Sequence, residues 1–293
     1  MAIKLLALDL DGTLLNSHGK ISERNREAID GARARGVRVA LVTGRRFRDA
    51  RPLALELGLD VPLISHNGAL TKHARSLETV SAMLLPLQEA REVLRIGRAL
   101  DSDALVSDDP VGAGLLVYDH VNESNRAVRE YIAWARRIHG EEAAGAVRHV
   151  ESLEDYLDHA PVHIGFTGGC APMEHLLESF QSELGNAVKI FATMYPKKDF
   201  AILDVVNPEA SKGVGLAAVA DEQHVAREEV MAMGDNFNDL EMLQYAGTCV
   251  VMGNAEASLR NTLSDHAGFH TTATNDEDGV AQAIERFILN GGG

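Results

Sequence analysis

The sequence predicts an α/β protein with a doubly wound parallel sheet and an inserted α+β domain. Short apolar runs, such as Ile3 to Leu8 and Val37 to Val42, are each followed by a turn and a helix-forming stretch. This alternation is typical of a parallel sheet covered by helices on both faces. Polar residues follow several runs, at the edge where open α/β sheets bind ligands. Between residues 86 and 190 the pattern changes to helices and short strand-like pieces, which predicts the insertion.

Length and composition are those of an ordinary globular protein. The 293 residues can bury one large core or two smaller ones. The formal net charge of −15 argues against nucleic acid or an anionic membrane as the main partner. No segment is apolar enough for a membrane span, and the N-terminus lacks the features of a signal peptide. The two cysteines, Cys170 and Cys249, indicate a reducing compartment rather than a disulfide framework. We therefore expect a cytoplasmic protein. Its expected oligomeric state is a monomer or a homodimer.

The end of the first strand carries two carboxylates. Asp9 and Asp11 are two residues apart, so on an extended backbone they project to the same side, with Cα atoms roughly 6.6 Å apart. Gly12 allows a sharp turn beside a ligand, and Thr13 adds a hydroxyl. An isolated strand that ends in Asp-Gly is more often a solvated turn. A catalytic or metal-binding role is favoured because further polar groups follow later strands.

The next two strands also end in polar residues. Thr43, Gly44 and Arg45 follow the second strand, where a hydroxyl and a neighbouring amide can donate to a phosphoryl oxygen. An ordinary helix cap is the alternative for the threonine. Arg45 either pairs with an anion or is simply solvated. After the run Val61 to Ser65, Asn67 either contacts substrate or forms an Asn-Gly turn.

Two later segments return to the strand pattern of the beginning. Phe200 to Val206 precedes Lys212, a lysine at a helix start, where the helix dipole disfavours a cation. A nearby anion would explain this position, although most single lysines are merely exposed. Val230 to Met233 precedes Asp235 and Asp239. These carboxylates either cap the following helix or supply the hard oxygen ligands that magnesium prefers.

The pattern predicts residues 1–85 and 191–293 as a core domain and residues 86–190 as an inserted α+β domain. Helices are expected in the insertion over Leu87 to Leu100, Glu123 to His139 and Met173 to Leu184.

Zinc and nicotinamide cofactors are not favoured. The twelve histidines form no helical metal-binding pair, because Pro161 separates His159 from His163. Glycine pairs at 112 and 114 and at 213 and 215 lack the third glycine of a dinucleotide-binding loop.

Five motifs, in order, resemble the haloacid dehalogenase (HAD) superfamily. More narrowly, they resemble its Cof-type branch, which has a large α/β cap between the family's second and third catalytic motifs, here Thr43-Gly-Arg and Ser211-Lys-Gly. The similarity extends over nearly the whole chain. The motifs are Asp9-Leu-Asp-Gly-Thr-Leu, Thr43-Gly-Arg, Ser65-His-Asn-Gly-Ala, Ser211-Lys-Gly and Gly234-Asp-Asn-Phe-Asn-Asp.

The resemblance implies a role for each matching residue. Asp9 would be the nucleophile that attacks phosphorus, and Asp11 would be the general acid and base. The phosphoryl group would be held by Thr43, Lys212 and Asn238. Mg²⁺ would be bound by the Asp9 and Asp235 side chains and the Asp11 backbone carbonyl, with Asp239 in support.

The resemblance further implies a magnesium-dependent phosphatase for small phosphorylated metabolites, with sugar phosphates as the expected substrates. The carboxylate at Asp11 separates this chain from the dehalogenases of the superfamily, which lack it, and from the ion pumps, which carry lysine there. One departure is that Pro208-Glu209-Ala210 precedes Ser211-Lys-Gly, whereas the family often has glycine two residues before this Ser-Lys. A phosphomutase and a catalytically silent metabolite-binding protein are the alternatives.

Overall fold

The run Leu5–Asp9 forms β1, a wholly buried central strand, in the computed structural model, which describes residues 2–139 and 143–290. Burial on both faces is what its uninterrupted apolar sequence predicts. The first sheet has the order β14 (Phe269–Thr271), β13 (Thr248–Val251), β12 (Val230–Gly234), β1, β2 (Arg38–Val42), β3 (Leu63–Ser65), β4 (Leu70–Lys72), β5 (Thr79–Ala82).

The strand order reverses beside β1. The chain first moves outward from β1 through β2 and β3, and later returns to place β12 on the other side of β1, followed by β13 and β14. All six of these strands pair in parallel, whereas β4 is antiparallel to β3. The predicted doubly wound parallel sheet is therefore confirmed. Ligands in such sheets bind at the carboxyl ends of the strands, where the order reverses.

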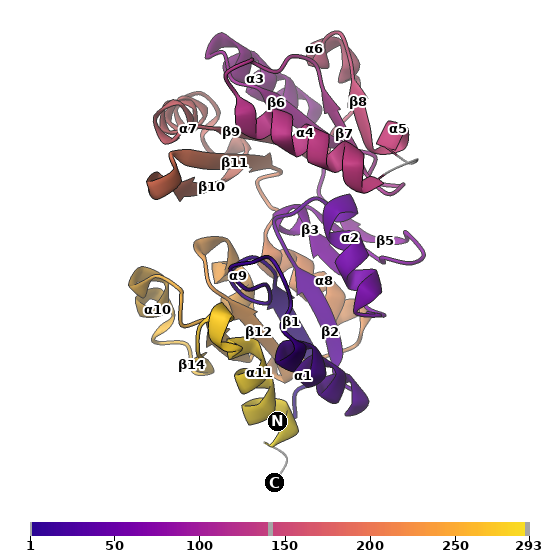
Figure 1. Ribbon diagram of the computed structural model, residues 1–293, viewed down its shortest axis with the longest axis vertical. Coiled ribbons are helices and arrows are strands. Elements are labelled where there is room, and N and C mark those ends of the chain that lie inside the picture. The colour runs from indigo at the N-terminus through magenta and orange to yellow at the C-terminus, as the bar shows by residue number, and fades with distance from the viewer. Residues whose placement is uncertain (1, 140–142, 291–293) are drawn as a thin grey trace. The chain divides into compact units, whose positions relative to one another are not determined.

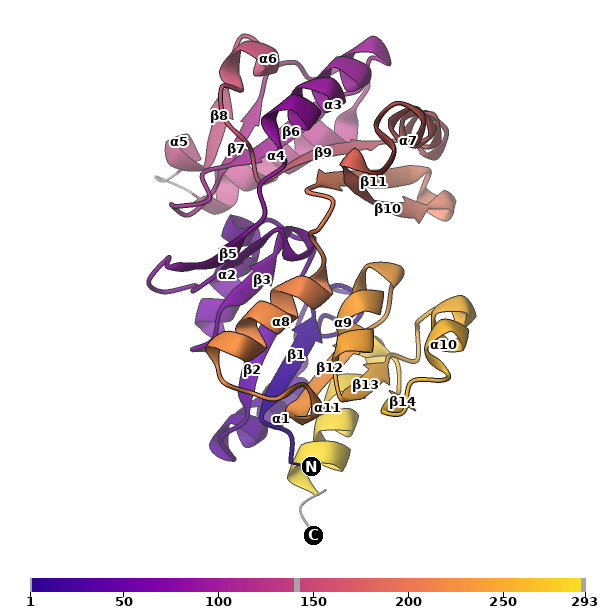
Figure 2. The ribbon, with the colours of Figure 1, turned by 180° about the vertical axis from the view of Figure 1, so that it is seen from behind.

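Helices cover both faces of the first sheet (Figure 1). They are α1 (Glu23–Ala34), α2 (Phe47–Glu56), α8 (Lys212–Glu222), α9 (Leu240–Tyr245), α10 (Ala257–Leu263) and α11 (Gly279–Ile284), which continues as a π-helical turn over Glu285–Leu289. Apolar residues of α8, α9 and α10 form one core with alternate residues of the central strands. Figures 1 and 2 show α1 and α11 on the opposite face.

The first two helices contain one side-chain cap and one internal proline. The Ser22 side chain accepts a hydrogen bond from the Asn25 backbone N–H and so caps the start of α1. Pro52 lies inside α2 rather than at its start, where it removes one backbone hydrogen bond of the helix.

The second sheet is mostly antiparallel and belongs to a separate compact unit. Its strand order is β10 (Lys189–Tyr195), β11 (Phe200–Val206), β9 (His163–Gly168), β6 (Ala104–Asp108), β7 (Leu115–Tyr118), β8 (Val147–His149). Its helices are α3 (Leu87–Ala99), α4 (Arg126–His139), α5 (Ala143–Ala146), α6 (Leu153–Tyr156) and α7 (Cys170–Leu184). One apolar core joins the sheet to α3, α6 and α7, and a smaller one joins it to α4 and α5. The predicted α+β insertion is present, with its three expected helices.

The boundaries of this unit differ from those predicted. The chain divides into Met1–Arg45, Ala50–Ser81 and Ser211–Gly293 as one unit, and Arg46–Asp49 and Ala82–Ala210 as the other. The sequence pattern predicts that the chain returns to the core domain at residue 191. In the structure, β10 and β11 form a hairpin in the second sheet and pair onward to β9. The physical reason is that strand pairing, which local apolar character does not specify, decides the sheet to which Phe200–Val206 belongs.

Among the described residues, none of the helices combines the length and the apolar character that a membrane span requires. Cys170 and Cys249 are both free thiols.

Candidate active site

A buried lysine joins two carboxylates at the carboxyl edge of the first sheet. The ammonium group of Lys212 donates to Asp9 Oδ1 and to Asp239 Oδ1, each at 2.6 Å. All three residues are at least 96% buried. Lys212 is the first residue of α8, directly after Ser211, whose side chain caps the helix. A nearby anion would explain a lysine at a helix start, and two carboxylates are present beside Lys212. Lys212 takes this position although Pro208-Glu209-Ala210 replaces the glycine-containing segment that the family often has before it.

Like charges dominate the electrostatics of the site. Burial raises the pKa of Asp9 well above its ordinary value, and the charges of Asp239 and Asp235 raise it further, against the opposing effect of Lys212. Burial, followed by the charge of Asp239, raises the pKa of Asp235 to about 7. Burial alone would lower the pKa of Lys212, but the adjacent Asp239 and Asp9 carboxylates outweigh it and raise that pKa. One lysine thus leaves the carboxylates under-neutralised, which favours an additional cation.

Three carboxylates form a cluster that could hold a metal ion. Asp9, Asp235 and Asp239 each offer one oxygen, and these oxygens lie within 4.8 Å of one another. Asp239 is already engaged at both oxygens, because Oδ1 accepts from Lys212 and Oδ2 accepts from the backbone N–H groups of Asp235 and Asn236. The side-chain contacts of Asp235 are longer, from Thr13 at 3.1 Å and Asn254 at 3.4 Å, and the hydrogen bond from Lys212 to Asp9 uses Oδ1 alone. Asp9 and Asp235 are therefore better placed as direct ligands than Asp239. The donor set of carboxylate oxygens fits a hard divalent cation such as Mg²⁺.

The loop after β1 packs directly against Asp235. The hydroxyl of Thr13 donates to Asp235 Oδ1 at 3.1 Å, joining residues from opposite ends of the chain. Gly12 has φ +88°, and a Cβ atom there would lie 2.3 Å from Asp235 Oδ2. No other residue could occupy this position without moving the carboxylate. The glycine of the first motif is thus required by both backbone conformation and space.

The Asp11 side chain forms an ion pair with an arginine at the protein surface. Its carboxylate accepts from Arg45 Nε at 2.8 Å and from Arg45 Nη2 at 2.6 Å, a two-pronged ion pair. The Asp11 side chain is 58% exposed, in contrast to that of Asp9. Of the two alternatives for Arg45, pairing with an anion is the one observed, and the anion belongs to the protein. The Asp11 side chain does not join the carboxylate cluster.

A second group of predicted residues gathers around Asn67. Its Oδ1 accepts from the Asn238 side chain at 3.0 Å, and its backbone N–H donates to the Thr43 carbonyl at 3.1 Å. Gly44 packs against the same side chain, since a Cβ there would lie 3.0 Å from Asn67 Oδ1. The Thr43 hydroxyl accepts from the Arg45 backbone N–H, as a cap would. The loops after β2 and β3 and the loop before α9 therefore meet at this amide.

Sequence reasoning assigned no role to Asn254. This residue follows β13 and donates from Nδ2 to the Gly12 carbonyl at 2.8 Å and, at a longer 3.4 Å, to Asp235 Oδ2. The available signal was the one that identified Asp9 and Asp235, a polar residue at the carboxyl end of an apolar run.

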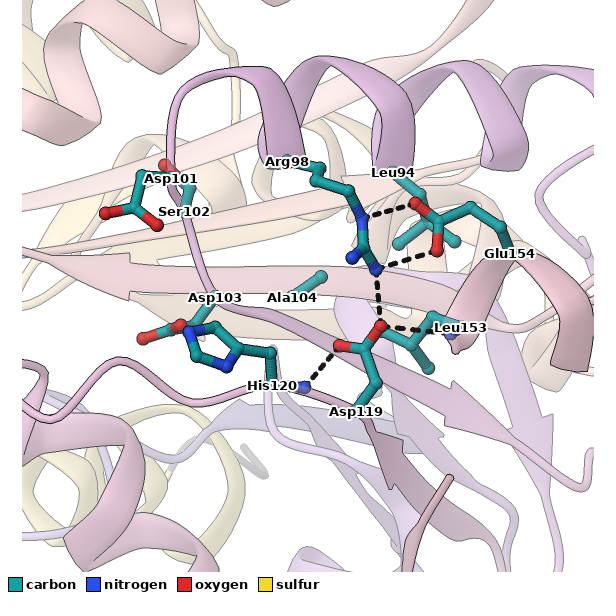
Figure 3. A pocket seen from close by; sticks show the side chains of 10 residues that line it. All are labelled: Leu94, Arg98, Asp101, Ser102, Asp103, Ala104, Asp119, His120, Leu153 and Glu154. Carbon is teal, nitrogen blue, oxygen red and sulfur yellow. Dashed lines mark hydrogen bonds and ion pairs between the residues drawn. The ribbon is translucent and has the colours of Figure 1, made fainter. Parts of the chain in front are cut away.

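The second unit has a small cavity of its own, shown in Figure 3. It holds about 50 Å³, enough for a water or two. Arg98 is paired there with Glu154 and Asp119, and Asp119 also accepts from the backbone of His120 and Leu153. The arginine and carboxylates in this network are already paired, so we interpret it as structural.

The fold and the site define an α/β protein with a doubly wound sheet and a buried centre of carboxylates and a lysine at the edge where the strand order reverses. The chain belongs to the family described as haloacid dehalogenase-like hydrolase, whose model matches residues 6–284. The resemblance seen in the motifs is thereby confirmed.

Relatives agree with this assignment over nearly the full chain. The stress response protein YhaX of Bacillus subtilis is 30% identical, covering 98% of this chain and 94% of its own. The B. subtilis protein YcsE, named 5-amino-6-(5-phospho-D-ribitylamino)uracil phosphatase, is also 30% identical, covering 98% and 96%. A haloacid dehalogenase-like hydrolase from Bacteroides thetaiotaomicron has a solved structure with a TM-score of 0.78, 28% identity, and coverage of 97% and 99%.

Proposed function

We propose that this protein is a magnesium-dependent phosphatase that hydrolyses small phosphorylated metabolites through an aspartyl-phosphate intermediate. The observation that carries the proposal is the buried Lys212 between Asp9 and Asp239, beside the Asp235 carboxylate. A phosphate ester is anionic, so a carboxylate nucleophile needs nearby positive charge before it can approach phosphorus. When bound, a divalent cation supplies such charge and stabilises the oxygens of the phosphoryl group. The Asp9 and Asp235 side chains and the Asp11 carbonyl would hold it, with Asp239 in support.

The chemistry divides into two displacements. The Asp9 carboxylate attacks phosphorus, the bond from phosphorus to the ester oxygen breaks, and Asp11 donates a proton to the departing oxygen. Water then attacks the phosphorus of the aspartyl-phosphate, Asp11 accepts a proton from this water, and the bond from phosphorus to the Asp9 oxygen breaks, which releases inorganic phosphate and restores the Asp9 carboxylate. Lys212, Thr43 and Asn238 are the proposed partners of the phosphoryl oxygens. Gly44 would contribute its backbone amide, and Asn67 would orient Asn238.

Asp11 must change partner to take this role. Its carboxylate is bound by Arg45 at two oxygens and points to solvent. We propose that Asp11 leaves Arg45 and turns toward the ester oxygen when substrate binds. Arg45 is then available to an oxygen of the substrate, because its planar fork suits carboxylate and phosphate groups.

Sugar and polyol phosphates are the proposed substrate class. YcsE, at 30% identity, is named for a substrate that carries phosphate on a ribityl chain. The net charge of −15 disfavours polyanions and so agrees with small monoesters, in which the local cations outweigh the global field. A cytoplasmic location, the absence of nucleic-acid partners and a monomeric or dimeric state stay predictions.

The test is a phosphate-release screen over sugar phosphates, pyridoxal phosphate, nucleotides and phosphoglycolate, with Mg²⁺ or with EDTA. We expect turnover only with the metal, and its loss in Asp9→Asn. The matched control is Asp30→Asn, the same change at an exposed position of α1. If Asp9→Asn keeps wild-type turnover, Asp9 is not the nucleophile.

The same screen separates the alternatives. A phosphomutase would keep the phosphoryl group and need a bisphosphate activator, so free phosphate without an activator excludes it. A silent binding protein would show no magnesium-stimulated turnover with any ester.

A further inference from the structure

Asn254 occupies a bridging position between the two loops that carry the proposed metal ligands. One loop follows β1 and includes Gly12, and the other follows β12 and includes Asp235. The Asn254 side chain lies at both, with Nδ2 at 2.8 Å from the Gly12 carbonyl oxygen and 3.4 Å from Asp235 Oδ2. Its own element, the turn after β13, contributes none of the family motifs.

The orientation of the Asn254 amide is determined by its other end. Asn254 Oδ1 accepts a hydrogen bond from the Asn275 backbone N–H at 3.0 Å. A backbone N–H can only donate, so the carbonyl end must face Asn275 and the NH₂ end must face the loops. Both groups there, a carbonyl and a carboxylate, can only accept. Asn275 is in turn attached to the first loop, since its side chain donates to the Leu15 carbonyl at 2.9 Å.

These contacts hold the Asp235 carboxylate at both oxygens. Thr13 donates to Oδ1, and Asn254 approaches Oδ2. Without such donors, the side chain would be free to rotate away from Asp9 and Asp239, whose negative charges repel it. A carboxylate held in place against this repulsion is already positioned for a cation.

We infer that Asn254 is a positioning residue for the divalent cation, which orients the Asp235 ligand and fixes the Gly12 peptide beside it. The inference rests on the proposed function, because it concerns the cation of the same site. Groups that orient metal ligands typically contribute a factor of roughly 10 to 100 in metal affinity. Loss of the Asn254 amide should therefore weaken Mg²⁺ binding and leave the fold intact, since its side chain is exposed.

The experiment is a calorimetric titration of the metal-free protein with MgCl₂, which needs no substrate. We expect Asn254→Ala to raise the Mg²⁺ Kd roughly 10-fold or more, with the Tm in EDTA unchanged. Asn261→Ala in α10 is the matched control, the same change on a nearby helix, and should bind as wild type. Should the alanine variant fold poorly, Asn254→Ser keeps a shorter donor and is expected to weaken binding in the same direction.

Each result has a distinct meaning. Unchanged Mg²⁺ affinity in Asn254→Ala overturns the inference, and so does a lower Tm in EDTA with unchanged affinity, which would indicate a structural role only. In both cases, magnesium-dependent turnover that requires Asp9 leaves the proposed function standing. A wild-type protein that binds no Mg²⁺ would instead overturn the metal proposal itself.

Discussion

Asp11 is the residue whose observed position differs most from its proposed role. The family motif implies a general acid and base, but the carboxylate is paired with Arg45 at the protein surface. A short aspartate side chain can exchange partners by rotation about two bonds. The resting arrangement is therefore compatible with the role, provided that substrate binding supplies the exchange.

The first prediction is that Asp11→Asn separates the two chemical steps. p-Nitrophenolate leaves without a proton, so the variant should still form the aspartyl-phosphate from p-nitrophenyl phosphate but hydrolyse it slowly. We expect a burst of roughly one nitrophenolate per enzyme followed by steady turnover lowered about 10²- to 10⁴-fold. Rapid-mixing absorbance measurements would detect it. Alkyl phosphates should show no burst of released alcohol, because an alkoxide needs the proton that Asp11 would donate. Wild-type steady-state turnover in Asp11→Asn would remove the residue from the mechanism.

Sequence alone could place the carboxylates and the lysine but not their partners. Asp9 and Asp235 lie where strands end, and Lys212 lies where a helix begins. Parallel topology brings such positions to one edge of the sheet. The pairing of Asp11 with Arg45 depends on side-chain rotation, which no spacing rule describes. Asn254 was missed because an asparagine after a glycine is also an ordinary turn residue.

At the level of elements, the loop after β3 connects several parts of the site. His66, Asn67 and Gly68 all have positive φ, at 51°, 53° and 93°, which is rare for residues other than glycine. Gly68 packs on the start of α8, and a Cβ there would lie 1.9 Å from the Ser211 carbonyl oxygen. Strain of this kind persists where the surrounding structure enforces it.

The second prediction compares two glycines with similar backbone requirements. Gly19 also has positive φ, at 69°, but no atom lies within 4 Å of a Cβ placed there. Gly19→Ala should cost only the conformational penalty, about 1–2 kcal/mol. Gly68→Ala adds the clash with Ser211 and shifts α8 and Lys212, so we expect a larger loss of stability and a fall in kcat. Denaturant unfolding and turnover measure both. Equal destabilisation of the two variants would show that the Ser211 contact is unimportant.

Sequence patterns located the elements better than they assigned them to sheets. The helices α3, α4 and α7 were expected within a few residues of their observed ends, because their length and apolar spacing are local properties. β11 was assigned to the wrong sheet, since a mostly apolar strand fits either one. A missed signal was the short turn Pro196–Lys198, followed by Asp199 at φ 43°, which joins β10 and β11 as a hairpin.

For the whole molecule, the topology concentrates negative charge where the strand order reverses. β1 and β12 are neighbours although they lie far apart in sequence, and each ends beside one of the proposed ligands, Asp9 or Asp235. Burying like charges together opposes folding, so the site is maintained at a cost in stability. Proteins commonly tolerate such local conflicts where function requires them.

The third prediction follows from that cost. The pKa of Asp235 is raised from 3.8 to about 7, so stability contributed by its protonated form is present at low pH and is lost as pH rises from about 4 through 7. In EDTA, Asp235→Asn lacks this loss, and its Tm relative to wild type should be higher at about pH 8 than at about pH 5.

Magnesium should reverse the order of the Tm values, so that wild type becomes more stable than Asp235→Asn. A cation that binds only the folded state stabilises wild type by about 2.7 kcal/mol at a hundred times its Kd, whereas Asp235→Asn lacks a ligand and should gain little. Thermal unfolding in Mg²⁺ and in EDTA measures both effects, with Asp30→Asn as the control for loss of an exposed carboxylate. If Asp235→Asn gained as much from Mg²⁺ as wild type, the cation would bind elsewhere. A Tm difference in EDTA that does not vary with pH would show that the buried charge of Asp235 is no burden to the fold.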